Sequence, residues 1–182
     1  DCVEGFFEHL GVCMPCAPGR YKMARRNEPC SQRCPEHTTS HFGASQMEDC
    51  HCEIGYFRDE NADLYLSCEA CPRGTFAAFF ASSRCDACPN GTSTSGTAAA
   101  DLADCVCAEG FERQANSTLC SACGAGFFKQ HTGFLPCSPC RLGATSLTGA
   151  SSEAECFCRA GFEASGEACV ECPLGRYGSE SG

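Results

Sequence analysis

The chain has 182 residues, of which 21 are cysteine, and this content predicts a disulfide scaffold from an oxidising, extracellular compartment. Its formal net charge of −10 argues against binding to nucleic acid or to an anionic membrane, because both favour a basic face. No stretch approaches the roughly 20 apolar residues that span a bilayer, and no signal peptide is evident, so we expect no membrane insertion in this segment and an export signal upstream of Asp1.

Four similar segments follow one another along the chain at intervals of 50, 55 and 51 residues: Cys2-Val-Glu-Gly-Phe, Cys52-Glu-Ile-Gly-Tyr, Cys107-Ala-Glu-Gly-Phe and Cys158-Arg-Ala-Gly-Phe. Within each full repeat, one cysteine is followed by a Cys-x-x-Cys pair, a second close pair and a Cys-x-Cys that opens the next repeat. A fixed period of this kind indicates a tandem array. We therefore predict three full repeats and a partial one, at residues 1–50, 51–105, 106–156 and 157–182.

Local turn signals recur in the same phase. A glycine stands three residues and an aromatic residue five residues after a cysteine, as in Gly19 and Tyr21 or Gly74 and Phe76. Such a glycine suits a turn with positive φ, and the aromatic side chain can pack on a neighbouring disulfide. The later loops, at 92–100 and 145–152, are rich in Gly, Ser, Thr and Ala and predict turns rather than helices.

Two motifs carry a family resemblance. One is Cys-x-Cys followed by x-x-Gly-aromatic, as in Cys50-His-Cys-Glu-Ile-Gly-Tyr, and the other is Cys-Pro-x-Gly-x-aromatic, as in Cys71-Pro-Arg-Gly-Thr-Phe. With these motifs the whole chain resembles the ephrin-receptor-like cysteine-rich repeat, which is related to epidermal-growth-factor-like and tumour-necrosis-factor-receptor-like modules. The resemblance implies a small disulfide-rich fold of tandem modules with short antiparallel β-ribbons, stacked as an elongated rod.

The cysteines of one repeat allow many connectivities by themselves, and the resemblance selects among them. It implies these bonds: Cys2–Cys13, Cys16–Cys34, Cys30–Cys50, Cys52–Cys68, Cys71–Cys88, Cys85–Cys105, Cys107–Cys120, Cys123–Cys140, Cys137–Cys156 and Cys158–Cys169. Cys172 is left unpaired, and we expect its partner beyond Gly182.

Zinc binding, calcium binding and catalysis are the alternatives to a purely structural scaffold. The spacing of Cys68, Cys71, Cys85 and Cys88 is compatible with a zinc ribbon, but each repeat adds a Cys-x-Cys and the chain lacks a basic face. The pair His37 and His41 would share one face only in a helix, which the intervening Thr-Thr-Ser disfavours. No acidic cluster precedes Cys71 to hold calcium, and no nucleophile, base or phosphate loop is visible. The expectation is no enzyme activity, no metal and no cofactor.

Three surface features point to modification or binding. Asn90-Gly-Thr and Asn116-Ser-Thr are acceptor motifs for N-linked glycans. The segment 20–26 concentrates positive charge and is a candidate contact for an acidic partner or a sulfated glycan, but a solvated loop is the favoured account. Phe79 and Phe80 lie outside the repeated pattern, and a small module has little interior for them, so they are candidates for local burial or for a partner contact.

These features together predict a non-enzymatic extracellular segment of a larger secreted or cell-surface protein. Its role would be structural or adhesive: a spacer, a stalk, or a component of an extracellular filament or appendage. The expected partners are other extracellular or surface proteins, including further copies in a filament. The alternative is the ligand-binding ectodomain of a cell-surface receptor, which the sequence does not separate from the first.

Overall fold

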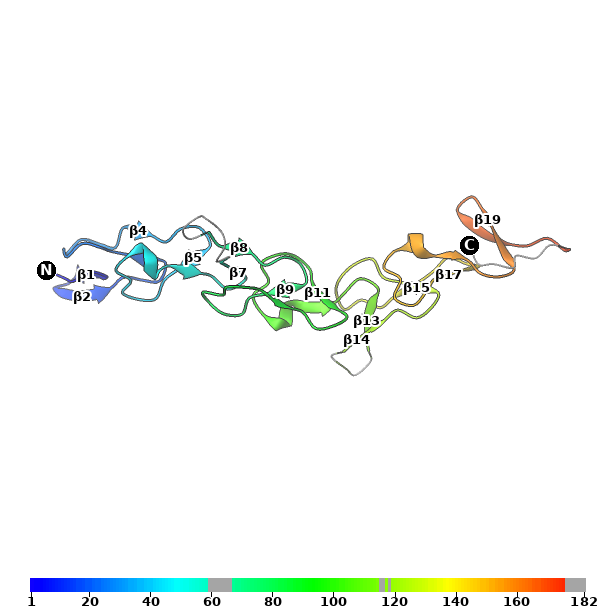
Figure 1. Cartoon of the computed structure of the whole chain (residues 1–182), viewed down its shortest axis with the longest axis horizontal. Coiled ribbons are helices and arrows are strands. Elements are labelled where there is room, and N and C mark those ends of the chain that lie inside the picture. The colour runs from blue at the N-terminus through cyan, green and yellow to red at the C-terminus, as the bar shows by residue number, and fades with distance from the viewer. Residues whose placement is uncertain (59–66, 115–116, 118, 176–182) are drawn as a thin grey trace. The chain divides into compact units, whose positions relative to one another are not determined.

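The fold consists of short antiparallel ribbons (Figure 1). A computed structural model describes residues 1–58, 67–114, 117 and 119–175. In these residues the strands form ten two-stranded sheets, and the helices are three single turns of 3-10 helix, at Met47–Asp49, Leu102–Asp104 and Glu153–Glu155. The tandem, small disulfide-rich fold predicted from the sequence is confirmed.

The ten ribbons follow the chain order, and each pairs two strands in antiparallel register. The first five are β1 (Phe6–His9) with β2 (Val12–Pro15), β3 (Arg20–Tyr21) with β4 (Gln32–Arg33), β5 (Thr38–Thr39) with β6 (His51–Cys52), β7 (Tyr56–Phe57) with β8 (Glu69–Ala70), and β9 (Thr75–Phe76) with β10 (Asp86–Ala87). The other five are β11 (Thr92–Thr94) with β12 (Cys105–Cys107), β13 (Phe111–Arg113) with β14 (Cys120–Ala122), β15 (Phe127–Phe128) with β16 (Ser138–Pro139), β17 (Ala144–Thr145) with β18 (Phe157–Cys158), and β19 (Phe162–Ser165) with β20 (Ala168–Glu171).

The chain forms two compact units. The first comprises Asp1–Ala87 and Gly96–Asp104, and the second comprises Cys88–Ser95 and Cys105–Gly182. The repeat boundaries predicted from the sequence stay a prediction.

One turn recurs at the start of every ribbon. It follows a cysteine. The backbone N–H of the fourth residue after that cysteine donates to the carbonyl of the first residue after it; after Cys16, for example, Arg20 donates to Ala17 at 3.1 Å. The third residue after the cysteine has positive φ, as a type II turn requires, which is why glycine stands there. These residues are Gly5, Gly19, His37, Gly55, Gly74, Gly91, Gly110, Gly126, Gly143, Gly161 and Gly175. His37, at φ 57°, holds the position without glycine.

Ten disulfides are present, and four have the expected partners: Cys2–Cys13, Cys52–Cys68, Cys107–Cys120 and Cys158–Cys169. The other six expected bonds were wrong, namely Cys16–Cys34, Cys30–Cys50, Cys71–Cys88, Cys85–Cys105, Cys123–Cys140 and Cys137–Cys156. The structure instead joins Cys16–Cys30, Cys34–Cys50, Cys71–Cys85, Cys88–Cys105, Cys123–Cys137 and Cys140–Cys156. The bonds are sequential rather than interlaced.

Strand register explains the first of these corrections. The turn after Cys16 folds the chain back on itself, so that β3 runs beside the cysteine that precedes the turn. Tyr21 of β3 then pairs with Gln32 of β4, and this places Cys30 next to Cys16, at a Cα–Cα distance of 5.7 Å. That separation is well within the range that a disulfide bridges.

Cys34 is held on the other side of the same turn. Its N–H donates to the Gly19 carbonyl at 3.0 Å, and Cys34 then opens the next turn and the next ribbon. Its partner is accordingly Cys50, which precedes β6 of that ribbon. The interlaced pattern expected from the family resemblance fails because Cys30 and Cys34 lie on opposite sides of one turn.

The fifty-residue repeat is thus made of three ribbons, each closed by one disulfide. The sequence separations of the bonded cysteines run from 11 to 17 residues. Backbone bonds connect one ribbon to the next: Cys16 donates to Gly5 at 2.7 Å, and Cys123 donates to Gly110 at 2.7 Å. Each small loop is therefore locked covalently and also joined to its neighbour.

The buried interior is made of half-cystines and small residues. Cys16, Cys71, Cys107 and Cys123 are fully buried, and alanines rather than large aliphatic residues fill the gaps between ribbons. Backbone segments approach closely there, because a Cβ built on Gly110 would lie 2.3 Å from a backbone oxygen. The disulfides take the place of a conventional hydrophobic core.

Candidate functional site: repeat contacts and exposed surface

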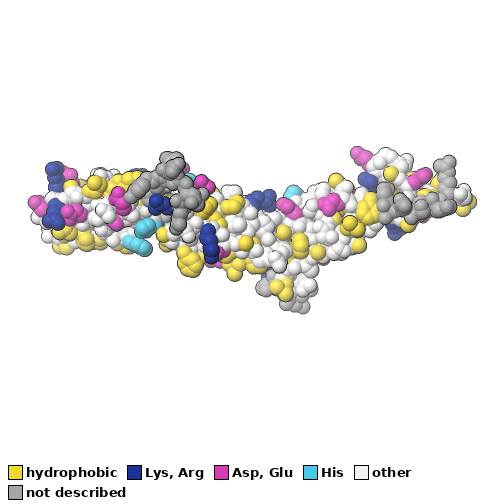
Figure 2. Space-filling view, viewed as in Figure 1, with side chains coloured by type: hydrophobic (Ala, Val, Ile, Leu, Met, Phe, Trp, Pro, Cys, Tyr) yellow, Lys and Arg dark blue, Asp and Glu magenta, His cyan; other side chains and the backbone are white. Residues whose placement is uncertain are grey.

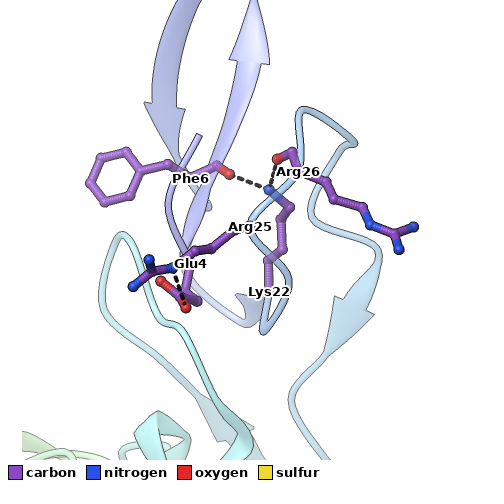
Figure 3. Close-up of polar contacts among 5 residues, drawn as sticks. All are labelled: Glu4, Phe6, Lys22, Arg25 and Arg26. Carbon is purple, nitrogen blue, oxygen red and sulfur yellow. Dashed lines mark hydrogen bonds and ion pairs between the residues drawn. The ribbon is translucent and has the colours of Figure 1, made fainter. Parts of the chain in front are cut away.

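The repeat contacts include two buried lysines that sequence reasoning missed. In repeat 1, the Lys22 ammonium donates to the carbonyls of Phe6, at 2.6 Å, and of Arg26 (Figure 3). The side chain is only 5% exposed and crosses from one ribbon to another. Beside it, the Arg25 guanidinium pairs with the Glu4 carboxylate at 2.8 Å. Hydrogen bonding to its own backbone, and then to Arg25, lowers the pKa of Glu4.

Lys129 occupies the same position in repeat 3. Its ammonium donates to the carbonyls of Phe111 at 2.7 Å, Gly133 at 2.6 Å and Cys107 at 3.4 Å. Removal from water lowers the pKa of this amine, although Glu112 opposes the shift. In repeat 2 the corresponding residue is alanine. The sequence signal was a lysine six residues after the second cysteine of the Cys-x-x-Cys pair, present in two repeats of three.

Most of the positive charge in segment 20–26 is engaged within the chain. Besides the contacts of Lys22 and Arg25 drawn in Figure 3, Arg20 donates to the Cys30 carbonyl at 3.0 Å and Arg26 lies 3.7 Å from Glu28. The ion pairs are exposed and contribute little stability individually. The engaged side chains favour the structural interpretation of this segment over that of a basic contact surface.

An acidic residue directly before each Cys-x-Cys caps a single helical turn. The Asp49 carboxylate accepts from the N–H groups of Ser45 at 2.7 Å and Gln46 at 3.1 Å. Asp104 and Glu155 occupy the same position and make equivalent bonds. Hydrogen bonds from the backbone and side chain of Ser45 lower the pKa of Asp49. Hydrogen bonds from the side chain and backbone of Ser151 lower the pKa of Glu155 in the same way. This signal, an acidic residue before Cys-x-Cys, was visible in the sequence and was overlooked.

The described residues hold no group of three or more His, Cys, Asp and Glu side chains that could bind a metal. The four cysteines of the zinc alternative are all in disulfides, with Cys68, Cys71 and Cys88 bonded to three different partners. Of the two histidines, His37 stacks on Tyr56, with ring centroids 4.2 Å apart. The zinc interpretation is therefore not supported.

Cys172 is the one cysteine in the described part of the chain without a disulfide partner. Its N–H donates to the Gly161 carbonyl at 3.0 Å, the contact that opens a ribbon elsewhere. That its partner lies beyond Gly182 stays a prediction.

The two glycan acceptor motifs differ in what can be said of them. Asn90 is exposed at the corner of the turn that runs from Pro89 to Thr92, where the Thr92 N–H donates to the Pro89 carbonyl at 3.0 Å. Asn116 lies outside the described residues.

Phe79 and Phe80 are exposed, with accessible fractions of 74% and 53%, so local burial does not account for them. Phe80 lines a pocket of about 210 Å³ together with Pro18, Thr39, Ser40, His41, Phe42 and His51. All seven residues belong to the first compact unit. Hydrophobic side chains reach the visible surface between charged ones elsewhere as well (Figure 2), but here two aromatic rings from separate ribbons share one hollow.

Within the described ranges, no helix has the length and apolar character needed to cross a membrane.

Known proteins resemble the chain over all or part of its length. Residues 61–105 and 110–156, half of the chain, match the family described as tyrosine-protein kinase ephrin type A/B receptor-like. Cysteine repeat modular protein A of Toxoplasma gondii is 36% identical over 202 aligned residues, which cover 94% of this chain and 6% of that protein. Ephrin type-A receptor 6 of Mus musculus is 39% identical over 71 residues, covering 39% of this chain and 7% of the receptor.

The chain thus spans only a small part of these relatives. What they share with it is the cysteine-rich repeat, and the matched segments contain the one-disulfide ribbons described above. Such modules, with their dense disulfides, are extracellular parts of secreted or surface proteins. The chain belongs to the ephrin-receptor-like family of cysteine-rich repeats, which is a family of extracellular modules and not of enzymes.

Proposed function

We propose that the chain is a non-enzymatic structural or adhesive segment of a larger secreted or cell-surface protein, serving as a spacer, a stalk or part of an extracellular filament. The observation that carries the proposal is the series of ribbons, each locked by its own disulfide. Neighbouring ribbons are also joined by backbone hydrogen bonds, as from Cys71 to Gly55 at 2.9 Å. A segment built this way resists extension and unfolding along its whole length.

The bond positions fix how far the segment can be stretched. With the disulfides intact, only the short stretches between bonded pairs can extend, so the path from Cys2 to Cys169 reaches about 150 Å. With the disulfides reduced, the same path reaches about 600 Å. The disulfides therefore prevent about three quarters of the extension that the reduced chain can reach, which suits a mechanical spacer.

Glycans fit the same role. Asn90 and Asn116 are proposed to carry N-linked glycans, which keep a surface segment hydrated and shield it from proteases. The exposed turn at Asn90 supports the first site. Mass spectrometry of the secreted chain before and after glycosidase treatment tests both.

The second candidate is a ligand-binding receptor ectodomain. It is favoured by the similarity to ephrin type-A receptor 6 and by the exposed aromatic pocket around Phe80. The proposed localisation is extracellular in either case. Whether the parent protein is secreted or remains on the surface is decided by its other segments.

One experiment separates the two candidates. The 182-residue chain, secreted by eukaryotic cells, is attached by its ends in an optical trap and is also displayed as tetramers on candidate cells. If the chain is a spacer, it extends only to about 150 Å while its disulfides are intact, and this length increases about fourfold on reduction. A spacer also shows no saturable binding to a surface protein other than itself. A long oxidised extension, or saturable binding to one heterologous receptor or ligand, would refute the spacer role.

A further inference from the structure

Repeat 2 lacks the lysine whose ammonium is bound to backbone carbonyls in repeats 1 and 3. Lys22 and Lys129 are each only 5% exposed, so their stems and ammonium groups occupy the interior (Figure 3). The counterpart in repeat 2 is Ala77, which is 2% exposed and whose side chain ends at Cβ. Repeat 2 therefore has the arrangement that a lysine-to-alanine substitution would produce at this buried position.

The backbone around Ala77 matches the backbone around the two lysines. The Gly55 N–H donates to the Ala77 carbonyl at 2.8 Å, and the Ala77 N–H donates to the Ala99 carbonyl at 3.0 Å. The loop also closes on the first ribbon in the same way, because the Ala81 N–H donates to the Cys52 carbonyl at 3.0 Å. The equivalent bonds of repeat 3 run from Gly110 to Lys129 at 2.9 Å, from Lys129 to Ala150 at 3.1 Å, and from Gly133 to Cys107 at 2.8 Å. The Cβ of Ala77 thus points along the path that the lysine stem takes in the other repeats.

The carbonyls that accept from the ammonium in the other repeats have counterparts in repeat 2. Tyr56 occupies the position of the accepting phenylalanine, and Ala81 stands four residues after Ala77, as the second acceptor stands after each lysine. The Cys71 N–H donates to the Gly55 carbonyl at 2.9 Å, so the next pair of the ladder, which contains Tyr56, is a non-hydrogen-bonded pair. The Tyr56 carbonyl therefore points away from β8, and no residue in the described part of the chain donates to it.

The chemistry of these oxygens favours an ammonium ion. The atoms that bind the two lysine ammonium groups are all backbone carbonyl oxygens, with no carboxylate among them. Such a set suits a single positive charge that brings its own N–H donors, whereas protein calcium sites draw on carboxylates. A buried carbonyl without a donor is also costly, and a cavity left by truncating a buried side chain accepts a small molecule of matching shape.

From these observations we propose that repeat 2 contains a binding site for a small primary alkylammonium ion. The alkyl part lies beside Ala77, where the lysine stem lies in the other repeats, and the ammonium donates to the carbonyls of Tyr56 and Ala81. The matching probe is n-propylammonium, whose carbons and nitrogen correspond to the lysine atoms beyond Cβ. The inference goes beyond the proposed function, since a spacer needs no such ligand.

Amide hydrogen exchange on the secreted 182-residue chain, with its disulfides intact, tests the site. Exchange is measured in about 100 mM n-propylammonium chloride and in the same concentration of tetramethylammonium chloride, which carries the same charge but has no N–H group. So small a ligand binds weakly, and we expect a Kd of about 1–10 mM. Propylammonium should then slow exchange at the Gly55 and Ala81 amides at least about tenfold. The Gly5 and Gly110 amides, in repeats that have their own lysine, should not change.

Two variants locate the response. Ala77→Lys supplies a tethered ammonium and should abolish the effect of propylammonium on repeat 2. Lys129→Ala removes the ammonium of repeat 3 and should produce the same effect at the Gly110 and Gly133 amides. A non-reducing peptide map that recovers the Cys71–Cys85 and Cys123–Cys137 bonds establishes that each variant is folded.

The wild-type measurement decides the inference even where a variant fails to fold. Unchanged exchange at Gly55 and Ala81 in about 100 mM propylammonium, or an equal effect of tetramethylammonium, would overturn it. A response in a folded Ala77→Lys chain that equals the wild-type response would overturn it as well, because the ligand would then bind elsewhere.

Discussion

The close backbone approach at Gly110 gives the sharpest test of how the ribbons are held together. Gly110 has φ 77°, and a Cβ on it would lie 2.3 Å from the Gly149 oxygen. Gly161 occupies the same turn position, with φ 87°, but a Cβ there would meet nothing within 4 Å. Gly110→Ala and Gly161→Ala therefore share the backbone strain and differ in the clash.

The expected magnitudes follow from these two terms. Alanine at positive φ costs about 1–2 kcal/mol, which Gly161→Ala pays alone. At Gly110 the added methyl must also push the neighbouring backbone away, and overpacking of this kind adds about 1–3 kcal/mol. The free energy of opening the ribbons around Gly110 and Gly149 should then fall by about 2–5 kcal/mol.

Amide hydrogen exchange measured with the disulfides intact reports this difference locally. A loss of about 2–5 kcal/mol corresponds to a fall in protection of at least about thirtyfold in the segment from β14 to Ala150, against a smaller, local fall near Gly161 for the control. Equal effects of the two alanines would show that the turn conformation alone, and not the contact between ribbons, limits opening.

Three further predictions follow from other contacts. Lys129→Met leaves the carbonyls that accept from the Lys129 ammonium without this donor, and it should lower the free energy of unfolding by about 1–3 kcal/mol in chemical denaturation. An unchanged free energy of unfolding would mean that water replaces the ammonium at no cost. The folded-state pKa of Asp49 is depressed, so its stabilising effect is present above the ordinary carboxyl pKa and is lost as pH falls through the folded value. Exchange at its two capped amides should accelerate on acidification in the wild type. In Asp49→Asn, whose amide oxygen accepts but does not titrate, exchange should be independent of pH after correction for intrinsic exchange. Non-reducing peptide mapping should recover Cys16 joined to Cys30, and recovery of Cys16 joined to Cys34 would contradict the sequential pairing.

The candidate surface illustrates why function was harder to predict than fold. The sequence singled out Phe79 and Phe80 because they break the repeat, and it could do so without knowing their surroundings. It could not show that Phe42, almost forty residues earlier, lines the same pocket as Phe80. Contacts between distant ribbons depend on how each ribbon is turned, which no local motif records.

The sequence by itself determined the class of the fold, the phase of the repeats and the turn positions, because cysteine spacing and positive-φ glycines are local requirements of a short chain. The spacing left open which of Cys30 and Cys34 bonds to Cys16, since they stand only four residues apart, and the family resemblance selected the wrong one. Only the tertiary structure decided that choice, through the register of β3 with β4. It likewise decided that Lys22 is buried, with its ammonium bound to backbone carbonyls rather than solvated, because the oxygens that bind this ammonium come from two different ribbons.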